Sequence, residues 1–150
     1  MQIIKNGEVT QDNWTFIDDD TALNADYNII SLTRWQNIDP ETRKKSKHLG
    51  VRLESDVILE EVNKDFNNLD LIELYIPVFT DGRAFTHARL LRSRFDFTGD
   101  IRVSGDFMRD QVFYFSRVGV SSFALNEQDN AEEVIASLND FSVTYQVSTA

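Results

Sequence analysis

Two short stretches of the chain place acidic, basic and glycine residues where a strand is expected to end and a helix to begin. They are Asp81, Gly82 and Arg83 in one stretch, and Gly105, Asp106, Arg109, Asp110 and Gln111 in the other. Arginine offers a flat fork of N–H donors, which binds a carboxylate, a phosphate or a sulfur oxyanion through paired hydrogen bonds. Neighbouring carboxylates could act as acid or base. Both stretches are therefore candidates for binding a small anion.

The arginines of the chain are concentrated around these stretches. From Asp81 to Gly119 there are seven arginines and five aspartates, but no lysine and no glutamate. Arg89 and Arg92 complete the set of candidate ligand-binding residues. Two interpretations remain open, because these arginines either hold an anionic ligand or pair with the aspartates of the same block.

The stretch around Asp106 has a structural explanation as well as a functional one. Asp106 is suited to cap the helix expected over 107–119, because its carboxylate can accept the exposed amides of the first turn. Arg109 is harder to explain in this way, since a cation is disfavoured in the first turn of a helix. We expect Arg109 to face an acid, such as Asp81 or Glu54, or an anionic ligand.

The order of the predicted elements would bring the two stretches together. We predict strands over 49–54, 71–79, 101–105, 120–125 and 142–147, and helices over 55–69, 83–95, 107–119 and 130–141. Alternation of this kind indicates an α/β fold with a mostly parallel sheet of consecutive βα units, either an open sheet or a half-barrel. Ligands collect at the carboxyl ends of such strands. The strand over 71–79 should end near Pro77, which cannot donate to a neighbouring strand.

The N-terminal third has a different pattern. Asn6-Gly7 between short alternating runs predicts an antiparallel hairpin over 2–10, and a strand is expected over 27–35. The polar, basic segment over 39–50 is expected to be a mobile connection or to carry one short helix. We predict one domain over 1–150, in which residues 1–48 precede a βα core over 49–150. A homodimer is one way to cover the exposed sheet edges.

Composition limits the functions that remain. The chain has no cysteine, a formal net charge of −10, and glycines that match neither a dinucleotide fingerprint nor a phosphate-binding loop. A basic footprint for nucleic acid and an apolar run long enough to cross a membrane are both absent from the sequence. We expect a cytoplasmic protein with no metal, no cofactor, no nucleic-acid partner and no membrane partner.

The sequence over 79–125, which begins FTDGRAFTHARLLRSRF and ends VGVSSFAL, resembles the signature of a bacterial domain-of-unknown-function family, number 934. The likeness extends to IIKNGEV, SLTRW, LGVRLE and FSVTYQ. The resemblance implies a role in assimilatory sulfite reduction, as an oxidoreductase component or an accessory protein. It also implies sulfite reductase or another sulfur-assimilation protein as the partner, and it assigns no catalytic residue.

Three functions follow as hypotheses. The first is an accessory protein that docks on the reductase, passes electrons through a borrowed cofactor or holds an oxyanion with its arginines. The second is an enzyme that acts on a small anionic substrate. The third is a structural homodimeric interaction module in which the arginines and aspartates pair with one another.

Overall fold

The computed structural model of the protein describes residues 2–24, 26–78, 81–126 and 129–138. Its centre is one eight-stranded sheet with the order β2-β1-β8-β7-β6-β5-β4-β3. The strands are β1 (Gln2–Lys5), β2 (Glu8–Gln11), β3 (Thr15–Phe16), β4 (Tyr27–Ser31), β5 (His48–Leu53), β6 (Leu71–Ile76), β7 (Asp100–Gly105) and β8 (Ser122–Ala124). The helices are α1 (Leu32–Asn37), α2 (Pro40–Lys44), α3 (Arg83–Ser93) and α4 (Val112–Arg117), with 3-10 turns η1 (Leu59–Glu61), η2 (Phe66–Asn68) and η3 (Arg109–Gln111). Residues 131–138 are also helical.

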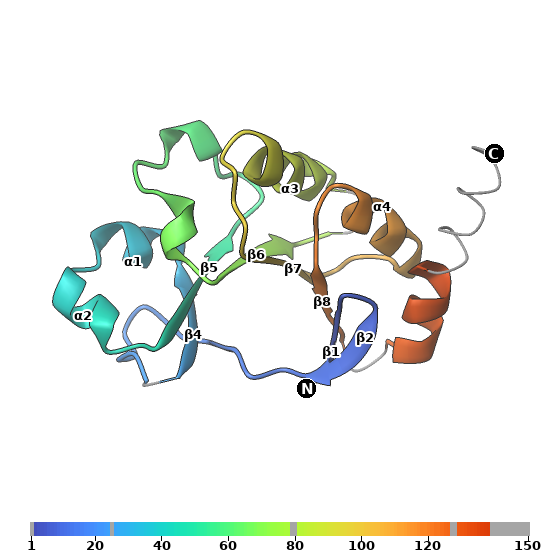
Figure 1. The fold of residues 1–150 in the computed structure, drawn as a ribbon, viewed down its shortest axis with the longest axis horizontal. Helices are drawn as coiled ribbons and strands as arrows, with labels where there is room; N and C mark the ends of the chain where they lie inside the picture. The colour runs from blue at the N-terminus through green and yellow to red at the C-terminus, as the bar shows by residue number, and fades with distance from the viewer. Residues whose placement is uncertain (1, 25, 79–80, 127–128, 139–150) are drawn as a thin grey trace.

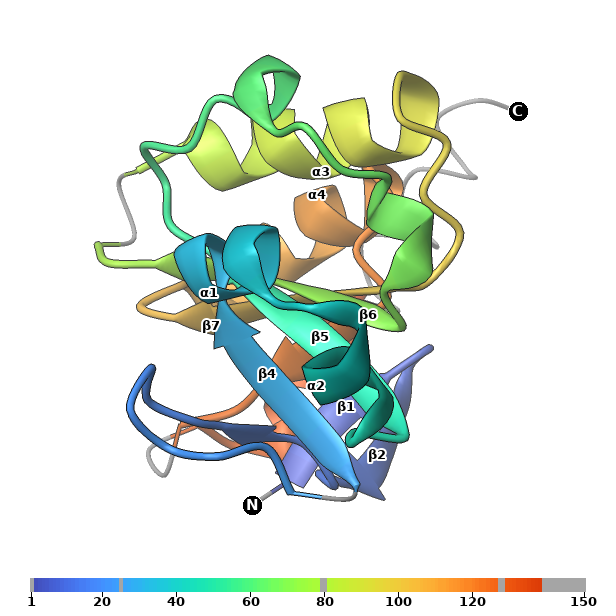
Figure 2. The same cartoon turned by 90° about the vertical axis from the view of Figure 1, so that its left-hand side faces the viewer.

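The strand directions confirm the predicted fold class. Strands β3 to β8 run parallel, and β1 pairs antiparallel with both β2 and β8. The turn of the β1–β2 hairpin contains Asn6 and Gly7, both with positive φ, as the sequence predicts. The sheet is curled and open, which corresponds to the half-barrel variant of the prediction, and α1, α3 and α4 lie on its convex side (Figure 1). Figure 2 shows α3 and α4 above the sheet from a second direction.

The curl of the sheet follows from the connection between its two edges. Residues 12–14, which we call the edge link, join β2 at one edge to β3 at the other. The chain from Gln11 to Thr15 can span at most roughly 14 Å, at about 3.6 Å per residue. The edges of a flat eight-stranded sheet would lie about 34 Å apart, at about 4.8 Å per strand. The edge link therefore requires the sheet to curl, and it crosses the concave side (Figure 1).

The apolar core lies between the convex face of the sheet and the helices. Its floor consists of alternate strand residues such as Val51, Leu74 and Val103, each at most 1% exposed. Phe85 of α3 and Phe115 of α4 stack with their ring centroids 3.9 Å apart, which fixes the two helices against each other. Burial of this face of the sheet leaves the concave face free for polar side chains.

Two predicted elements in the first half of the chain are wrong in their extent or type. The strand expected over 27–35 ends at Ser31, because the Ser31 hydroxyl accepts a hydrogen bond from the Arg34 amide (3.1 Å) and caps α1. The segment expected to be a helix over 55–69 instead contains only the turns η1 and η2. Asp65 begins the second turn by accepting a hydrogen bond from the Asn67 amide (2.9 Å), which interrupts a continuous helix.

The other predicted elements agree more closely with the structure. Strand β6 ends at Ile76, immediately before Pro77, and the segment over 39–50 carries the single short helix α2. The helix expected over 107–119 is present as η3 followed by α4. Its cap is not Asp106, because the helical turn starts after Met108, whose amide donates to the Gln111 side chain (2.8 Å). Of the helix expected over 130–141, residues 131–138 are helical, and the helix begins one residue later than expected. The strand expected over 142–147 lies outside the described residues.

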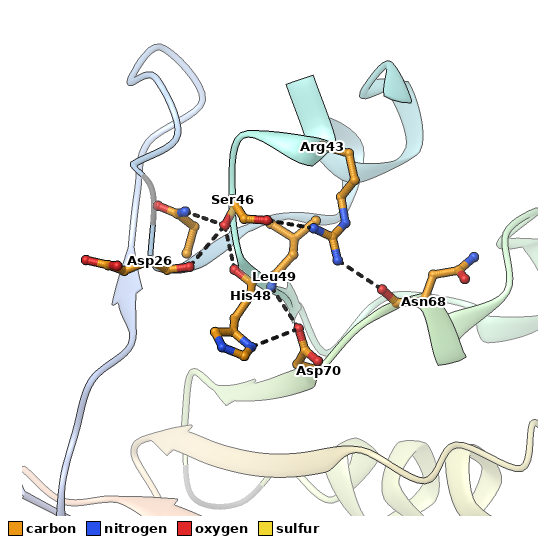
Figure 3. Close-up of polar contacts among 8 residues, drawn as sticks. Asp26, Arg43, Ser46, His48, Leu49, Asn68 and Asp70 are labelled. Carbon is orange, nitrogen blue, oxygen red and sulfur yellow. Dashed lines mark hydrogen bonds and ion pairs between the residues drawn. The ribbon is translucent and has the colours of Figure 1, made fainter. Parts of the chain in front are cut away.

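A polar network joins the amino ends of β4, β5 and β6 (Figure 3). The buried Asn28 side chain donates to the Ser46 hydroxyl (2.7 Å), and the Leu49 amide donates to Asp70 (3.1 Å). Arg43 donates to the backbone carbonyl of Ser46 (3.1 Å). Residues at this end of a parallel sheet usually serve stability, since ligands bind at the opposite end.

Gly105 lies at the carboxyl end of β7, where the backbones of β7 and β6 approach closely. It has a φ of +93°, and a Cβ atom there would lie 2.2 Å from the Ile76 carbonyl oxygen. We predict that Gly105→Ala lowers the free energy of unfolding by more than about 2 kcal/mol, since the left-handed backbone alone costs roughly 1–2 kcal/mol. Chemical denaturation measures the change.

Gly82→Ala is the matched control, because its added Cβ would have no atom within 4 Å and its φ is −85°. We expect it to cost less than about 1 kcal/mol, the usual loss at a helix N-cap. Equal losses in the two variants would contradict the close approach at Gly105.

Candidate functional site

The concave side of the curled sheet contains a pocket of about 330 Å³. Its walls are side chains of β5, β6, β7 and β8, and the edge link covers part of it with Asp12 and Trp14. Ser104, Gly105, Leu125 and Asn126 place it toward the carboxyl ends of the parallel strands, where α/β proteins usually bind ligands. We call it the concave pocket.

Three charged residues form a row across the floor of the concave pocket. Arg52 of β5 lies opposite Glu73 of β6 in the strand register, and Glu73 lies opposite Arg102 of β7. The Arg52 guanidinium forms an ion pair with Glu73, whose side chain is 5% exposed. Such a cross-strand pair of opposite charge stabilises a sheet, and here it compensates the buried charge of Glu73.

Arg102 is held by the edge link. Its two terminal nitrogens donate to the two carboxylate oxygens of Asp12, at 3.1 and 2.9 Å. The Arg102 side chain is 2% exposed and that of Asp12 is 8% exposed. A buried, bidentate pair of this kind is destabilising to break, because either partner alone would be an uncompensated buried charge. The pair therefore fastens the edge link to the sheet.

Two buried polar atoms of residues that line the pocket lack a hydrogen-bond partner among the residues that the structure describes. They are the Nε of Arg102 and the hydroxyl oxygen of Ser104. The two residues lie two positions apart on β7, so their side chains share the concave face. A buried polar group without a partner costs about 1–3 kcal/mol, so proteins retain few of them. Both atoms can donate a hydrogen bond, and a ligand with an acceptor oxygen would satisfy them.

One wall of the pocket is aromatic. The guanidinium of Arg52 lies 3.7 Å from the ring centre of Phe16 and 5.1 Å from that of Tyr75. Trp14 packs edge-on against Tyr27, with ring centres 5.1 Å apart. These flat groups give the pocket surfaces on which a planar ligand could stack.

The two stretches first identified in the sequence do not line one pocket together. Asp81 accepts hydrogen bonds from the Arg83 side chain (2.8 and 3.0 Å), and Arg83 also donates to Ser55 (3.0 Å). These hydrogen bonds lower the pKa of Asp81 well below its ordinary value, and the pKa of Arg83 is raised by the same contact. Gly82 precedes α3 at its N-cap position. The charged groups of the first stretch are therefore paired with each other.

The second stretch lies beside the helix over 131–138. Arg109 forms an exposed ion pair with Glu133 (3.0 Å), so the acid that it was expected to face is neither Asp81 nor Glu54. Arg109 and Asp110 line a separate open hollow of about 320 Å³, which neither Asp81 nor Arg83 lines. Asp106 is exposed, and its amide donates to the Ile76 carbonyl (2.8 Å).

Of the ten residues predicted to bind a ligand, Gly105 is the one whose atoms line the concave pocket. Arg92 instead binds the backbone carbonyls of Phe97, Gly99 and Gly119 at 2.8–3.0 Å, and its partial burial lowers the pKa of its guanidinium. It fastens the loops beside α3. Arg89 is exposed on α3, and Gln111 caps the turn η3.

The residues that the sequence prediction missed carried a readable signal. Arg52, Glu73 and Arg102 each stand in the middle of an apolar strand, in the runs VRL, IEL and IRV. A parallel sheet covered by helices on both faces has nearly continuous apolar strands. Charged residues at alternate positions therefore indicate that one face has no helices. Asp12 carried no such signal, because nothing nearby in sequence connects it to Arg102.

The described residues contain no helix with the length and apolar composition that crossing a bilayer requires. They also contain no group of three or more histidine, aspartate and glutamate side chains placed to hold a metal ion.

The model of a family described as bacterial protein of unknown function (DUF934) matches residues 50–150. No curated protein and no solved structure matches the chain. The matched range includes Arg52, Glu73, Arg102 and Ser104 of the concave pocket, whereas Asp12 lies before it.

Ser104 of β7 and Ser122 of β8 are both buried on the concave side, so the same substitution at the two positions can be compared. Ser122 donates from its buried hydroxyl to Asp100 (3.1 Å), whereas Ser104 has no such partner. We predict that Ser104→Ala raises the free energy of unfolding by about 1 kcal/mol, because it removes an unsatisfied buried hydroxyl. Ser122→Ala should lower the free energy of unfolding by about 1 kcal/mol, because it breaks a hydrogen bond.

Denaturant titration of the wild-type protein and the two variants measures both changes. If Ser104→Ala destabilised the protein as much as Ser122→Ala, the Ser104 hydroxyl would have a partner within the protein. It would then not be available to a ligand.

Proposed function

The chain belongs to the DUF934 family of bacterial proteins of unknown function, and from that starting point we propose that it is a cytoplasmic accessory component of assimilatory sulfite reduction. Its contribution is to bind a small ligand with acceptor oxygens in the concave pocket. The link to sulfite reduction rests on the resemblance of its signature over 79–125 to members of that family. The link to a ligand rests on the pocket.

The observation that carries the binding proposal is the pair of buried donors on β7. Arg102 and Ser104 both line the concave pocket, and no described protein group accepts a hydrogen bond from the Nε of Arg102 or the hydroxyl of Ser104. The pocket also lies toward the carboxyl ends of the parallel strands, where ligands bind in related architectures. These features together favour binding of a small molecule over a purely structural role.

The sequence favours an accessory role over an electron-transfer role of the chain by itself. It has no cysteine with which to hold an iron–sulfur cluster, and its glycines do not form a dinucleotide fingerprint. The exposed arginines considered first, Arg83 and Arg109, are engaged in ion pairs with Asp81 and Glu133. We therefore assign ligand binding to the concave pocket.

Growth on different sulfur sources tests this function. We predict that deletion of the gene slows growth of its bacterium on sulfate but not on cysteine, because only sulfate must pass through sulfite reduction. The wild-type gene should restore growth on sulfate, and Ser104→Ala should restore it only in part. Arg89→Ala, which changes an exposed residue outside the pocket, should restore it fully.

Equal growth of the deletion strain on the two sulfur sources would contradict the role in sulfite reduction. Full restoration by Ser104→Ala would contradict the role of the concave pocket. Immunoblotting of the variants confirms that they are present at equal levels.

A further inference from the structure

We propose that the ligand of the concave pocket is a planar organic molecule that carries a carbonyl or carboxylate oxygen and at most one negative charge. This inference rests on the proposed function, in that it assumes that the pocket binds a ligand. It goes further by stating the chemical class of that ligand, and it excludes the bare sulfur oxyanions.

The unpartnered hydrogen-bond donors define which part of the ligand must accept hydrogen bonds. Arg102 Nε carries a hydrogen and has no lone pair to accept with, so its partner must be an acceptor. The Ser104 hydroxyl lies on the same face of β7, two residues further along. Neighbouring unpartnered donors on two residues that line one pocket suit an oxygen with two lone pairs, such as that of a carbonyl or carboxylate.

The charges around the pocket limit the charge of the ligand. Its lining contains two positive side chains, Arg52 and Arg102, and two negative ones, Glu73 and Asp12. They are already joined in two ion pairs, so the lining has no excess positive charge. Sulfite, sulfate or phosphate would bring up to two uncompensated negative charges into a partly buried space, which is costly. A neutral or singly charged ligand avoids most of this cost.

The size and walls of the pocket define the body of the ligand. At about 330 Å³ the pocket lies within the range of known small-molecule sites, roughly 300–1,000 Å³, and an ion of four or five atoms would leave most of it unfilled. Trp14, Phe16 and Tyr75 contribute aromatic surface, and Ile29 and Leu125 contribute aliphatic surface. Aromatic rings and the flat Arg52 guanidinium stack most favourably on planar groups.

Ligand-observed NMR with a small set of probes tests the inference on the full chain. The probes are benzamide, which is planar and neutral, benzoate, which is planar with one charge, cyclohexanecarboxamide, which is not planar, and sulfite and sulfate. We expect saturable binding of benzamide and benzoate, weaker binding of cyclohexanecarboxamide, and no saturable binding of the two inorganic ions.

Ser104→Ala should weaken benzamide binding about fivefold to tenfold, the effect of one lost hydrogen bond. The exposed Ser93→Ala on α3 should leave it unchanged. Because Ser104→Ala removes a hydroxyl that has no hydrogen-bond partner among the described residues, the variant is expected to fold, and its circular dichroism spectrum checks this.

The outcomes separate the inference from the proposed function. If sulfite or sulfate binds and loses affinity in Ser104→Ala while benzamide and benzoate do not bind, the inference is wrong and ligand binding in the pocket stands. If no probe binds, or if binding is the same in wild type and Ser104→Ala, the inference is wrong and the assignment of binding to the concave pocket loses its support as well.

Discussion

The three residues that join the two edges of the sheet constrain the rest of the structure. Because the edge link over 12–14 is short, the eight strands cannot lie flat, and the sheet must curl toward the segment that connects its edges. Helices α1, α3 and α4 then cover the convex face, where the apolar core forms (Figure 1). The concave face carries the polar lining of the pocket, and buried charges there are tolerated only if each finds a partner.

The four charged side chains of the concave pocket are paired, and two polar atoms without a partner define the candidate site. Arg52 pairs with Glu73 across neighbouring strands, and Arg102 pairs with Asp12 from the edge link. The Arg102–Asp12 pair has two effects, since it fastens the link and directs the guanidinium so that Nε has no partner among the described residues. A buried donor beside the equally unsatisfied hydroxyl of Ser104 is costly for the folded protein alone. Binding of an acceptor would offset that cost, which is the physical reason to regard the pocket as a ligand site.

Sequence patterns predicted the order of the strands and helices better than the contacts between the two edges of the curled sheet. Alternating strand and helix patterns after residue 49 indicated the parallel sheet, and Asn6-Gly7 indicated the hairpin, because both signals are local in the chain. The prediction of a helix over 55–69 was wrong, because Asp65 and the polar residues after it favour separate turns anchored by Leu59 and Phe66.

The residues of the candidate site were largely missed by the sequence prediction. Asp12 and Arg102 are 90 residues apart, and only the strand order brings them together. The number of arginines in the two sequence stretches indicated a ligand site there, yet Arg83 and Arg109 form ion pairs within the protein.

A crystal structure of the full chain soaked with benzamide tests the central claim most directly. The account predicts density for the planar ring in the concave pocket, with its carbonyl oxygen about 3 Å from Arg102 Nε or from the Ser104 hydroxyl. It also predicts that Asp12 still holds the terminal nitrogens of Arg102. A structure in which benzamide binds elsewhere, or in which Arg102 Nε and Ser104 both bond to protein groups, would contradict it.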